Sequence, residues 1–258
     1  MLNDLLLLSG NDLPFPEAQL IIHQPTLKEI AFVGEENFFV GCGFLDFSKK
    51  LLSDKDKISL ENYHDFDIFM SIVINGRNDK NTKKSIESAF LVLDLMFPLY
   101  QITVRDGMIV LSQDGKEFYI NKTNFDAFRK ILSSMFNLNL NKSADGEYNP
   151  TGDMATRIAE KFKKRHEQLM KIENSKTQNK NFSILSRYVS ILAIGCQKDL
   201  NDLMKYTIYQ LYDEFQRFQL KMQWDAYIEA RMAGAQDLEE VDNWMIDLRD
   251  QGKNKNKK

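Results

Sequence analysis

The sequence predicts an α+β fold that is mainly helical, and three observations support this prediction. Most apolar residues recur every three or four positions, which is the spacing of an amphipathic helix. Between residues 99 and 121 that spacing gives way to short runs of β-branched and aromatic residues, separated by two Asp-Gly pairs. Hydrophobic residues make up 43% and charged residues 28% of the 258 residues, so the chain can form a real core.

The first part of the chain is expected to be mixed. Residues 18–25 (AQLIIHQP) are predicted to form a short strand that ends at Pro25. Thr26 and Glu29 have the spacing of a capping box, so a helix is expected to begin after Thr26. Gly34 is expected to end this helix and to separate it from a second short one.

Two longer helices are predicted to follow. Residues 65–75 (DFDIFMSIVIN) suit a helix or a strand, and a helix is favoured because the run is long and Asp65 can cap it. Residues 83–97 (KKSIESAFLVLDLMF) are predicted to form a helix that Pro98 closes.

Residues 99–121 are predicted to form three short antiparallel strands, a small β-meander. The pairs Asp106-Gly107 and Asp114-Gly115 indicate the two hairpin turns. Asp-Gly suits such a turn because both central residues of the favoured type need positive φ.

Helical spacing returns after the meander, where Thr123 or Asn124 can cap a helix. Its predicted apolar face consists of Phe125, Phe128, Ile131, Leu132 and Met135. Residues 141–152 are polar and punctuated by glycine and proline, which indicates an exposed loop. This loop is expected to separate a mixed α+β domain (1–140) from a helical domain (153–248).

The helical domain is expected to form a bundle. Its predicted elements are an amphipathic helix at 153–173, a linker at 174–181, and helices at 182–195, 198–204 and about 207–233. The last of these is expected to break at Gly234, before a short turn around Trp244. Residues 249–258 are predicted to form a disordered basic tail.

Nothing in the sequence indicates a catalytic or metal site, so the protein is expected not to be an enzyme and to use no cofactor or metal. The three histidines are His23, His64 and His166. None of them has another His, Cys or carboxylate residue at the sequence spacing of metal ligands. Cys42 and Cys196 are expected to be reduced thiols. Neither a phosphate-binding glycine loop nor a G-x-S-x-G serine motif is found.

Charge and hydropathy narrow the classes of partner. A net charge of -3 and a pI near 5.7 argue against a general nucleic-acid binder. The basic cluster at 161–171 (KFKKRHEQLMK) is best interpreted as a solvated helix face, with an acidic protein or a nucleic acid as the alternatives. The leucine-rich N-terminus lacks the flanks of a signal peptide, and no apolar stretch approaches the roughly 20 residues that cross a bilayer. A protein inside the cell, away from membranes, is expected.

The best-patterned stretch, 206–248, is expected to provide a binding surface. Its apolar stripe at helical spacing consists of Ile208, Leu211, Phe215, Phe218, Met222 and Ala226. The stripe either packs on the helices predicted at 153–173 and 182–195, or stays partly open to a partner helix. Aromatic and methionine side chains favour the second option, because they are typical of adaptable binding surfaces. The predicted partner-binding residues are Tyr209, Tyr212, Phe218, Met222, Trp224, Tyr227 and, in support, Trp244.

Three segments resemble tail assembly chaperones of tailed bacteriophages. They are PTLKEIAFVGEENFF (25–39), YNPTGDMATRIAEKFKKR (148–165) and the stretch from SILSRYVS to DNWM (183–245). The resemblance implies that the protein binds the tape measure protein and tail tube subunits in the host cytoplasm and is absent from the mature virion. A structural component of the tail or baseplate is the alternative, and a homo-oligomer is a further option.

Overall fold

The computed structural model describes residues 4–48, 62–76, 79–136, 183–235, 241 and 243–248. Five sequence predictions lie outside the described residues: the loop at 141–152, the helix at 153–173, the basic cluster at 161–171, the linker at 174–181 and the tail at 249–258.

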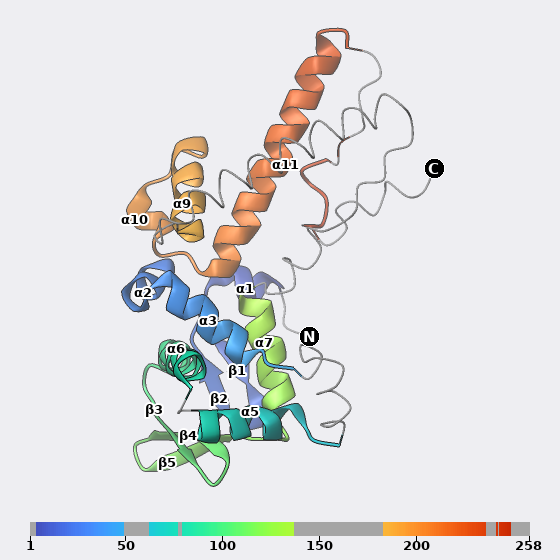
Figure 1. Cartoon of the computed structure of the whole chain (residues 1–258). Helices are drawn as coiled ribbons and strands as arrows, with labels where there is room; N and C mark the ends of the chain where they lie inside the picture. Colours follow the sequence, from blue (N-terminus) through green and yellow to red (C-terminus); the bar gives the residue numbers. More distant parts are fainter. Residues whose placement is uncertain are drawn as a thin grey trace.

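The described residues form a mainly helical α+β fold, which confirms the predicted fold class (Figure 1). In chain order the elements are α1 (Asp4–Ser9), β1 (Leu13–Phe15), η1 (Pro16–Ala18), β2 (Leu20–Ile22), α2 (Leu27–Val33), α3 (Glu35–Leu45), α5 (Asp65–Asn75), α6 (Lys80–Met96), β3 (Gln101–Arg105), β4 (Met108–Gln113), β5 (Lys116–Ile120), α7 (Phe125–Phe136), α9 (Ile184–Gly195), α10 (Leu200–Leu203) and α11 (Ile208–Met232).

The predicted start of the first helix is confirmed in detail. Strand β2 pairs antiparallel with β1 and is followed by α2, which begins with the expected capping box. The Thr26 hydroxyl accepts a hydrogen bond from the Glu29 backbone N–H, and the Glu29 carboxylate accepts one from the Thr26 N–H at 2.7 Å. Gly34, at φ 86°, then separates α2 from α3. That φ lies in the region that favours glycine, which explains why the helix stops there.

Helices α3 and α6 pack closely because α3 carries a glycine at the point of contact. A Cβ on Gly41 would lie 2.7 Å from Val92 Cγ2 and closer still to the carbonyl oxygen of Ser88. Only a residue without a side chain lets the two backbones come this near. Helix α6 itself starts at Lys80, earlier than predicted, because the Asp79 carboxylate caps it by accepting from the Thr82 N–H.

The helix favoured for residues 65–75 is confirmed as α5, but the prediction that Asp65 caps it is wrong. His64 is the N-cap: its Nδ1 accepts from the Phe66 N–H at 3.2 Å. Asp65 is instead the first helical residue and binds Arg129 Nη1 of α7 at 2.9 Å. An ion pair with a residue 64 positions away is a tertiary contact, which the local pattern does not reveal.

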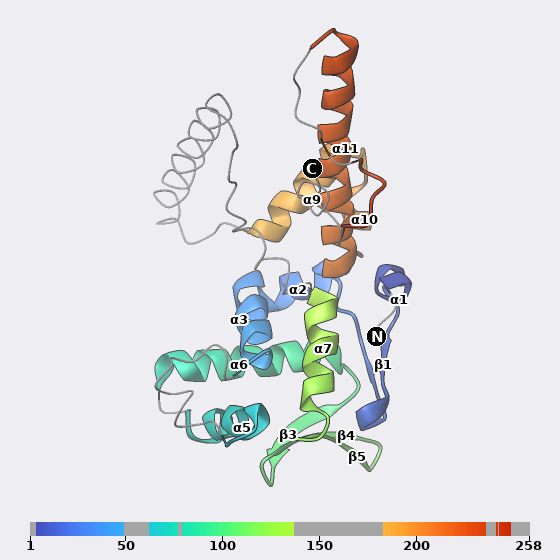
Figure 2. The same cartoon turned by 90° about the vertical axis from the view of Figure 1, so that its right-hand side faces the viewer.

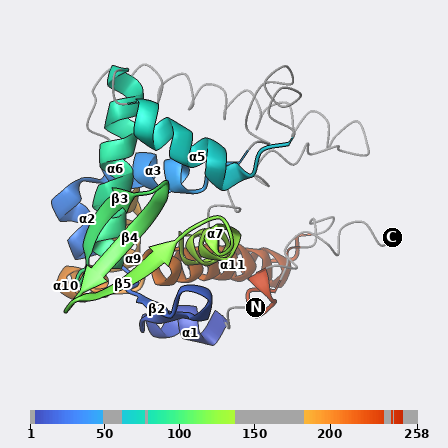
Figure 3. The same ribbon diagram turned by 90° about the horizontal axis from the view of Figure 1, so that it is seen from below.

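The predicted β-meander is confirmed as the three-stranded sheet β3-β4-β5. Asp106, Gly107, Asp114 and Gly115 all have positive φ, from 50° to 77°, as both hairpin turns require. The sheet lies at the end of the molecule opposite the free end of α11 (Figures 1 and 2), and Figure 3 shows it in front when the molecule is seen from below.

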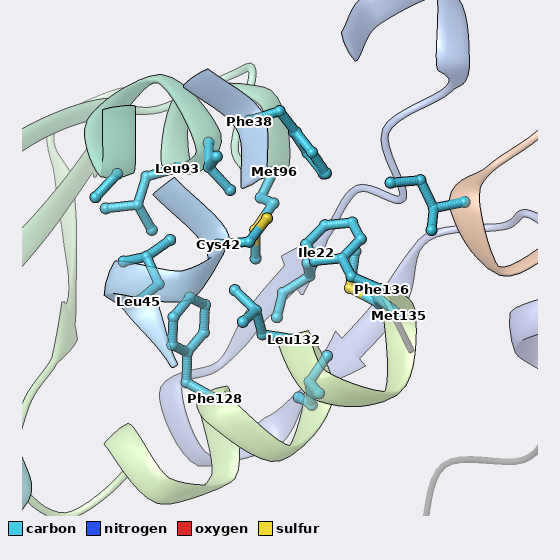
Figure 4. Packing of buried hydrophobic residues seen from close by; sticks show 14 of the residues in the cluster. Ile22, Phe38, Cys42, Leu45, Leu93, Met96, Phe128, Leu132, Met135 and Phe136 are labelled. Carbon is cyan, nitrogen blue, oxygen red and sulfur yellow. The ribbon is translucent and has the colours of Figure 1, made fainter. Parts of the chain in front are cut away.

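A large aromatic and aliphatic core fills the space between α3, α6, α7 and the β1–β2 hairpin (Figure 4). Phe38 meets Phe136 edge to face at 5.0 Å between ring centroids, and Phe128 packs on Phe15 and Phe97. All five apolar residues predicted for the face of α7 are buried. Both cysteines are free thiols, as predicted, and burial of Cys42 in this core raises its pKa well above the ordinary value.

The predicted helices of the C-terminal part that can be examined are confirmed as α9, α10 and α11, and α11 ends just before Gly234. Backbone hydrogen bonds join these helices to the N-terminal part of the chain. The N–H groups of Leu27 and Lys28 donate to the carbonyl oxygens of Tyr206 and Met204 at 2.8 and 3.0 Å. One hydrophobic cluster includes residues from α1 through α11. The division into two domains stays a prediction, and the described portions of both share this core.

Candidate interaction surface

The first half of α11 belongs to the hydrophobic core. Thr207 begins the helix with a second capping box, closed by Gln210. Ile208, Leu211 and Phe215 are buried, and the helix packs against α9, α7 and α1. Each aromatic ring or aliphatic side chain of this half therefore already has its neighbours within the chain.

The tyrosines of this half take part in the same packing. The ring of Tyr188 of α9 stacks on Phe215 at 4.1 Å between centroids and meets Tyr212 edge to face at 5.7 Å. Burial, together with the nearby Tyr188 and Glu35, raises the pKa of Tyr212 to about 12. Tyr212 is therefore neutral at physiological pH.

Gly195 and Phe218 form one close contact between α9 and α11. A Cβ on Gly195, the last residue of α9, would lie 2.8 Å from Cε2 of Phe218 and closer still to Cζ. Gly195 thus lets the Phe218 ring lie directly on the end of α9. One turn further along α11, Met222 is 54% exposed, and Met232 at the end of the helix is 83% exposed. On this face of α11 the exposed apolar side chains begin beyond Phe218, whereas Leu220, on another face, is still buried.

The second half of α11, residues 221–232, extends away from the rest of the fold beyond α9 (Figures 1 and 2). We call this half the distal segment. None of its residues is buried. Such a segment offers side chains on more than one face to another molecule, which a core helix does not.

Two of the predicted binding residues form a cluster on one face of the distal segment. The rings of Trp224 and Tyr227 lie 5.9 Å apart, and both side chains are half-buried. Arg231 donates to the Tyr227 hydroxyl at 3.0 Å and lies over its ring. At about 100° per residue, Trp224 and Tyr227 face roughly away from Met222.

The predicted binding residues are thus divided among several positions. Tyr209 and Tyr212 pack on the core, Phe218 lies at the end of α9, and Met222 is exposed beyond it. Trp224 and Tyr227 are brought together on another face, and Trp244 is half-buried in the terminal turn. Whether these residues bind a partner stays a prediction.

Two exposed residues near this surface were not among the binding residues predicted from the sequence. Ile194 is 82% exposed beside Gly195, and Glu229 is exposed on the distal segment. A signal for Glu229 was present, because it follows Phe218 and Met222 at helical spacing. Ile194 had no such signal, since its exposure depends on where α9 ends.

Polar contacts hold the loop after α9 against α11. Lys198 Nζ lies 2.5 Å from Glu214 Oε1 and donates to the Tyr206 hydroxyl at 2.6 Å. Burial lowers the pKa of Lys198, but the hydrogen bonds to Glu214 and Tyr206 outweigh this and raise it. The lysine therefore remains charged and fixes the approach to α11.

A second polar cluster lies near the start of α2. His23 Nδ1 is 2.8 Å from Asp12 and Nε2 is 3.3 Å from Glu29, the carboxylate of the capping box. Burial lowers the pKa of His23, but hydrogen bonds and charge from both carboxylates outweigh it, so the net shift is upward. The pKa of Glu29 is lowered: burial alone would raise it, but hydrogen bonds from Thr26 and His23 dominate. When His23 is protonated, this arrangement is an ion-pair network.

Within the described ranges, no group of three or more His, Cys, Asp or Glu side chains is placed to hold a metal ion. Across the same residues, no helix combines the length and the apolar character needed to span a bilayer.

Comparison with known proteins relates the C-terminal part to phages. Residues 175–248, which include α9, α10 and α11, match the model of a family described as the YomV second domain. That family is of a phage type, so the match associates the chain with phage proteins. No curated protein and no solved structure matches the sequence.

Proposed function

We propose that this protein is a non-enzymatic tail assembly chaperone of a tailed bacteriophage. It binds the tape measure protein, tail tube subunits or both in the host cytoplasm, and it leaves before the virion is complete. Two findings support the proposal: the resemblance of three segments to such chaperones, and the phage-type family matched over 175–248.

The distal segment of α11 is the observation that carries the proposal. The first half of α11 is built into the core, which fixes the direction of the helix. The distal segment, the part of α11 that extends past α9 (Figure 1), contains Met222, Trp224, Tyr227 and Met232, and none of these is buried. A rigid helix with flexible methionines and amphipathic aromatics suits reversible binding of an apolar helix.

The resemblance also supplies a physical reason for such binding. A tape measure protein is a long amphipathic helix whose apolar face would aggregate before tube subunits cover it. A chaperone must cover that face and later release it, so it needs a contact of moderate area with adaptable side chains. The distal segment provides side chains of this kind without a deep pocket.

Solubility of the partner tests the proposal. The tape measure protein of the same phage is expressed alone, with this protein, and with its Met222→Asp variant, and the soluble fraction is measured. We expect the wild type to raise that fraction several-fold and the variant to lose most of the gain. Gln223→Asp, which adds the same charge at a neighbouring exposed position, is the control and should retain the effect.

Mass spectrometry of purified virions separates the proposal from its alternative. A chaperone is expected to be absent from the particle, whereas a structural component of the tail or baseplate is present in fixed copy number. Stoichiometric recovery from virions would replace the chaperone with the structural role.

A further inference from the structure

We infer that α5 begins with a proton-sensitive cap: a neutral His64 holds the first turn of the helix, and a protonated His64 releases it. This device goes beyond the proposed function and does not depend on it. It follows from the two groups that the His64 ring faces, because one ring nitrogen cannot accept a hydrogen bond and carry a proton at once. Histidine is the side chain whose charge ordinarily changes between about pH 5 and pH 8.

The Nδ1 atom of His64 is the acceptor in this cap. It accepts a hydrogen bond from the Phe66 backbone N–H at 3.2 Å. A neutral imidazole carries one ring proton, so an accepting Nδ1 places that proton on Nε2. Nε2 lies 3.6 Å from the carboxylate of Asp126, in the first turn of α7. The neutral ring therefore presents an acceptor to Phe66 and a donor to Asp126.

Protonation removes the acceptor. Both nitrogens of an imidazolium are donors, so Nδ1–H would point at the Phe66 N–H. That N–H belongs to the first turn of α5, where no carbonyl of the same helix accepts it. The positive charge would also lie at the N-terminal end of the helix, which favours negative charge. Asp126 remains a partner for the imidazolium, so the ring can leave the cap and keep this contact.

The other half of the capping box does not change over the same pH range. The Asp67 carboxylate accepts from the His64 backbone N–H at 3.2 Å and from Lys122 Nζ at 2.7 Å. The hydrogen bond from Lys122 lowers the pKa of Asp67, so this carboxylate keeps its charge where histidine titrates. A change of the cap in this pH range is therefore assigned to the His64 ring.

Among the described residues, charged side chains from three parts of the fold surround this end of α5. Asp65 of α5 and Asp126 of α7 lie 2.9 and 3.4 Å from Nη1 of Arg129. Asp46, which follows α3, lies 3.7 Å from Nε of the same guanidinium. A guanidinium does not lose its proton in proteins. Arg129 therefore holds the ends of α3, α5 and α7 together in both states of His64.

The release is expected to be confined to the first turn of α5. The Phe66 side chain is buried, and its ring packs on Phe125 of α7 at 5.1 Å between centroids. The ring of Phe69, one turn further along, also lies 5.1 Å from Phe125. These apolar contacts do not titrate, so the body of α5 stays on the core. The proton controls only the point at which the chain enters α5.

Amide exchange at Phe66 in the full chain tests the inference. Nuclear magnetic resonance gives the protection factor of this amide, which compares its exchange rate with that of an unstructured peptide at the same pH. Loss of an N-cap favours opening of a helix start by about fivefold. We expect the wild-type protection factor to fall by about fivefold between about pH 8 and about pH 5.5. Nitrogen spectra of the ring should place the His64 proton on Nε2 at the higher pH.

His64→Asn provides the matched control. Asparagine is among the best N-caps and does not titrate, so Phe66 should keep its protection at both pH values. Because this variant retains His23 and every carboxylate, it isolates the effect of the His64 ring. His64→Ala has no cap and should show the low protection factor at both pH values.

Three results would each overturn the inference. The first is a wild-type protection factor at Phe66 that does not change with pH. The second is a His64→Asn protein that loses protection as the wild type does, because another group would then be responsible. The third is a His64 ring proton on Nδ1 at about pH 8, because the neutral ring would then not be the cap.

Discussion

A single methyl group at Gly41 should separate two helices of the core. In α3, a Cβ at this position would lie 2.7 Å from Val92 Cγ2 and closer to the Ser88 carbonyl oxygen, whereas ordinary contacts span 3.4–4 Å. Because the Ser88 atoms are backbone atoms, no rotamer change relieves the overlap. Helices α3 and α6 would have to separate by roughly 1 Å in a closely packed interior.

The net cost of Gly41→Ala can be worked out from two opposing effects. Overpacking a core costs about 1–3 kcal/mol, and the upper end applies here because backbone must move. Alanine is better than glycine inside a helix by about 1 kcal/mol. The variant should therefore lose about 2 kcal/mol of unfolding free energy, which corresponds to a Tm lower by about 4–8 °C.

Gly43, two residues along the same helix, provides a matched control. A Cβ there would meet nothing within 4 Å, so Gly43→Ala gains the helix propensity without the clash. Its Tm should rise by about 2–4 °C. Thermal melts and urea titrations followed by circular dichroism measure both variants. A Gly41→Ala protein as stable as Gly43→Ala would refute the close approach of α3 and α6.

Three further predictions concern the His23 network, the positions Phe218 and Met222 of α11, and the cysteines. The pKa of His23 is raised in the fold. The stability that protonated His23 contributes should therefore be complete below its unfolded pKa of about 6.5, and it should be lost as pH rises through the higher folded pKa. The difference in urea midpoint between wild type and His23→Gln should shrink over that pH range, and a difference that does not change with pH would contradict this. Phe218→Asp should lower the free energy of unfolding by about 2 kcal/mol or more, whereas Met222→Asp should change it by less than about 0.5 kcal/mol. Chemical denaturation measures both variants, and equal losses would mean that the two side chains are equally buried. A thiol reagent should modify half-buried Cys196 in the native protein and Cys42 only at the rate of unfolding, and rapid native labelling of Cys42 would argue against the core as described.

Features set by neighbouring residues were predictable from the sequence. The Thr26–Glu29 capping box, the two Asp-Gly turns and the apolar face of α7 all depend on residues within a few positions of one another. Their geometry follows from local hydrogen bonds, from allowed φ values and from the helical repeat. The predicted fold class was right because it is a sum of such local features.

The wrong prediction that Asp65 caps α5 shows where local reasoning stops. Asp65 is as good a cap by residue type, but its carboxylate binds Arg129, 64 positions away. The cap then falls to His64, whose own side chain accepts from the helix. No pattern within the segment distinguishes these two arrangements.

The candidate interaction surface was likewise predictable only in part from the sequence. Sequence alone predicted that α11 is one long helix with an apolar stripe from Ile208 to Ala226, because helical spacing is a property of the chain. Only the tertiary structure decided which part of that stripe is exposed, because burial depends on the length of α9 and on the contact of Gly195 with Phe218. A side-chain pattern determines which face of a helix is apolar, and the position of its neighbours in space determines how much of that face stays in water.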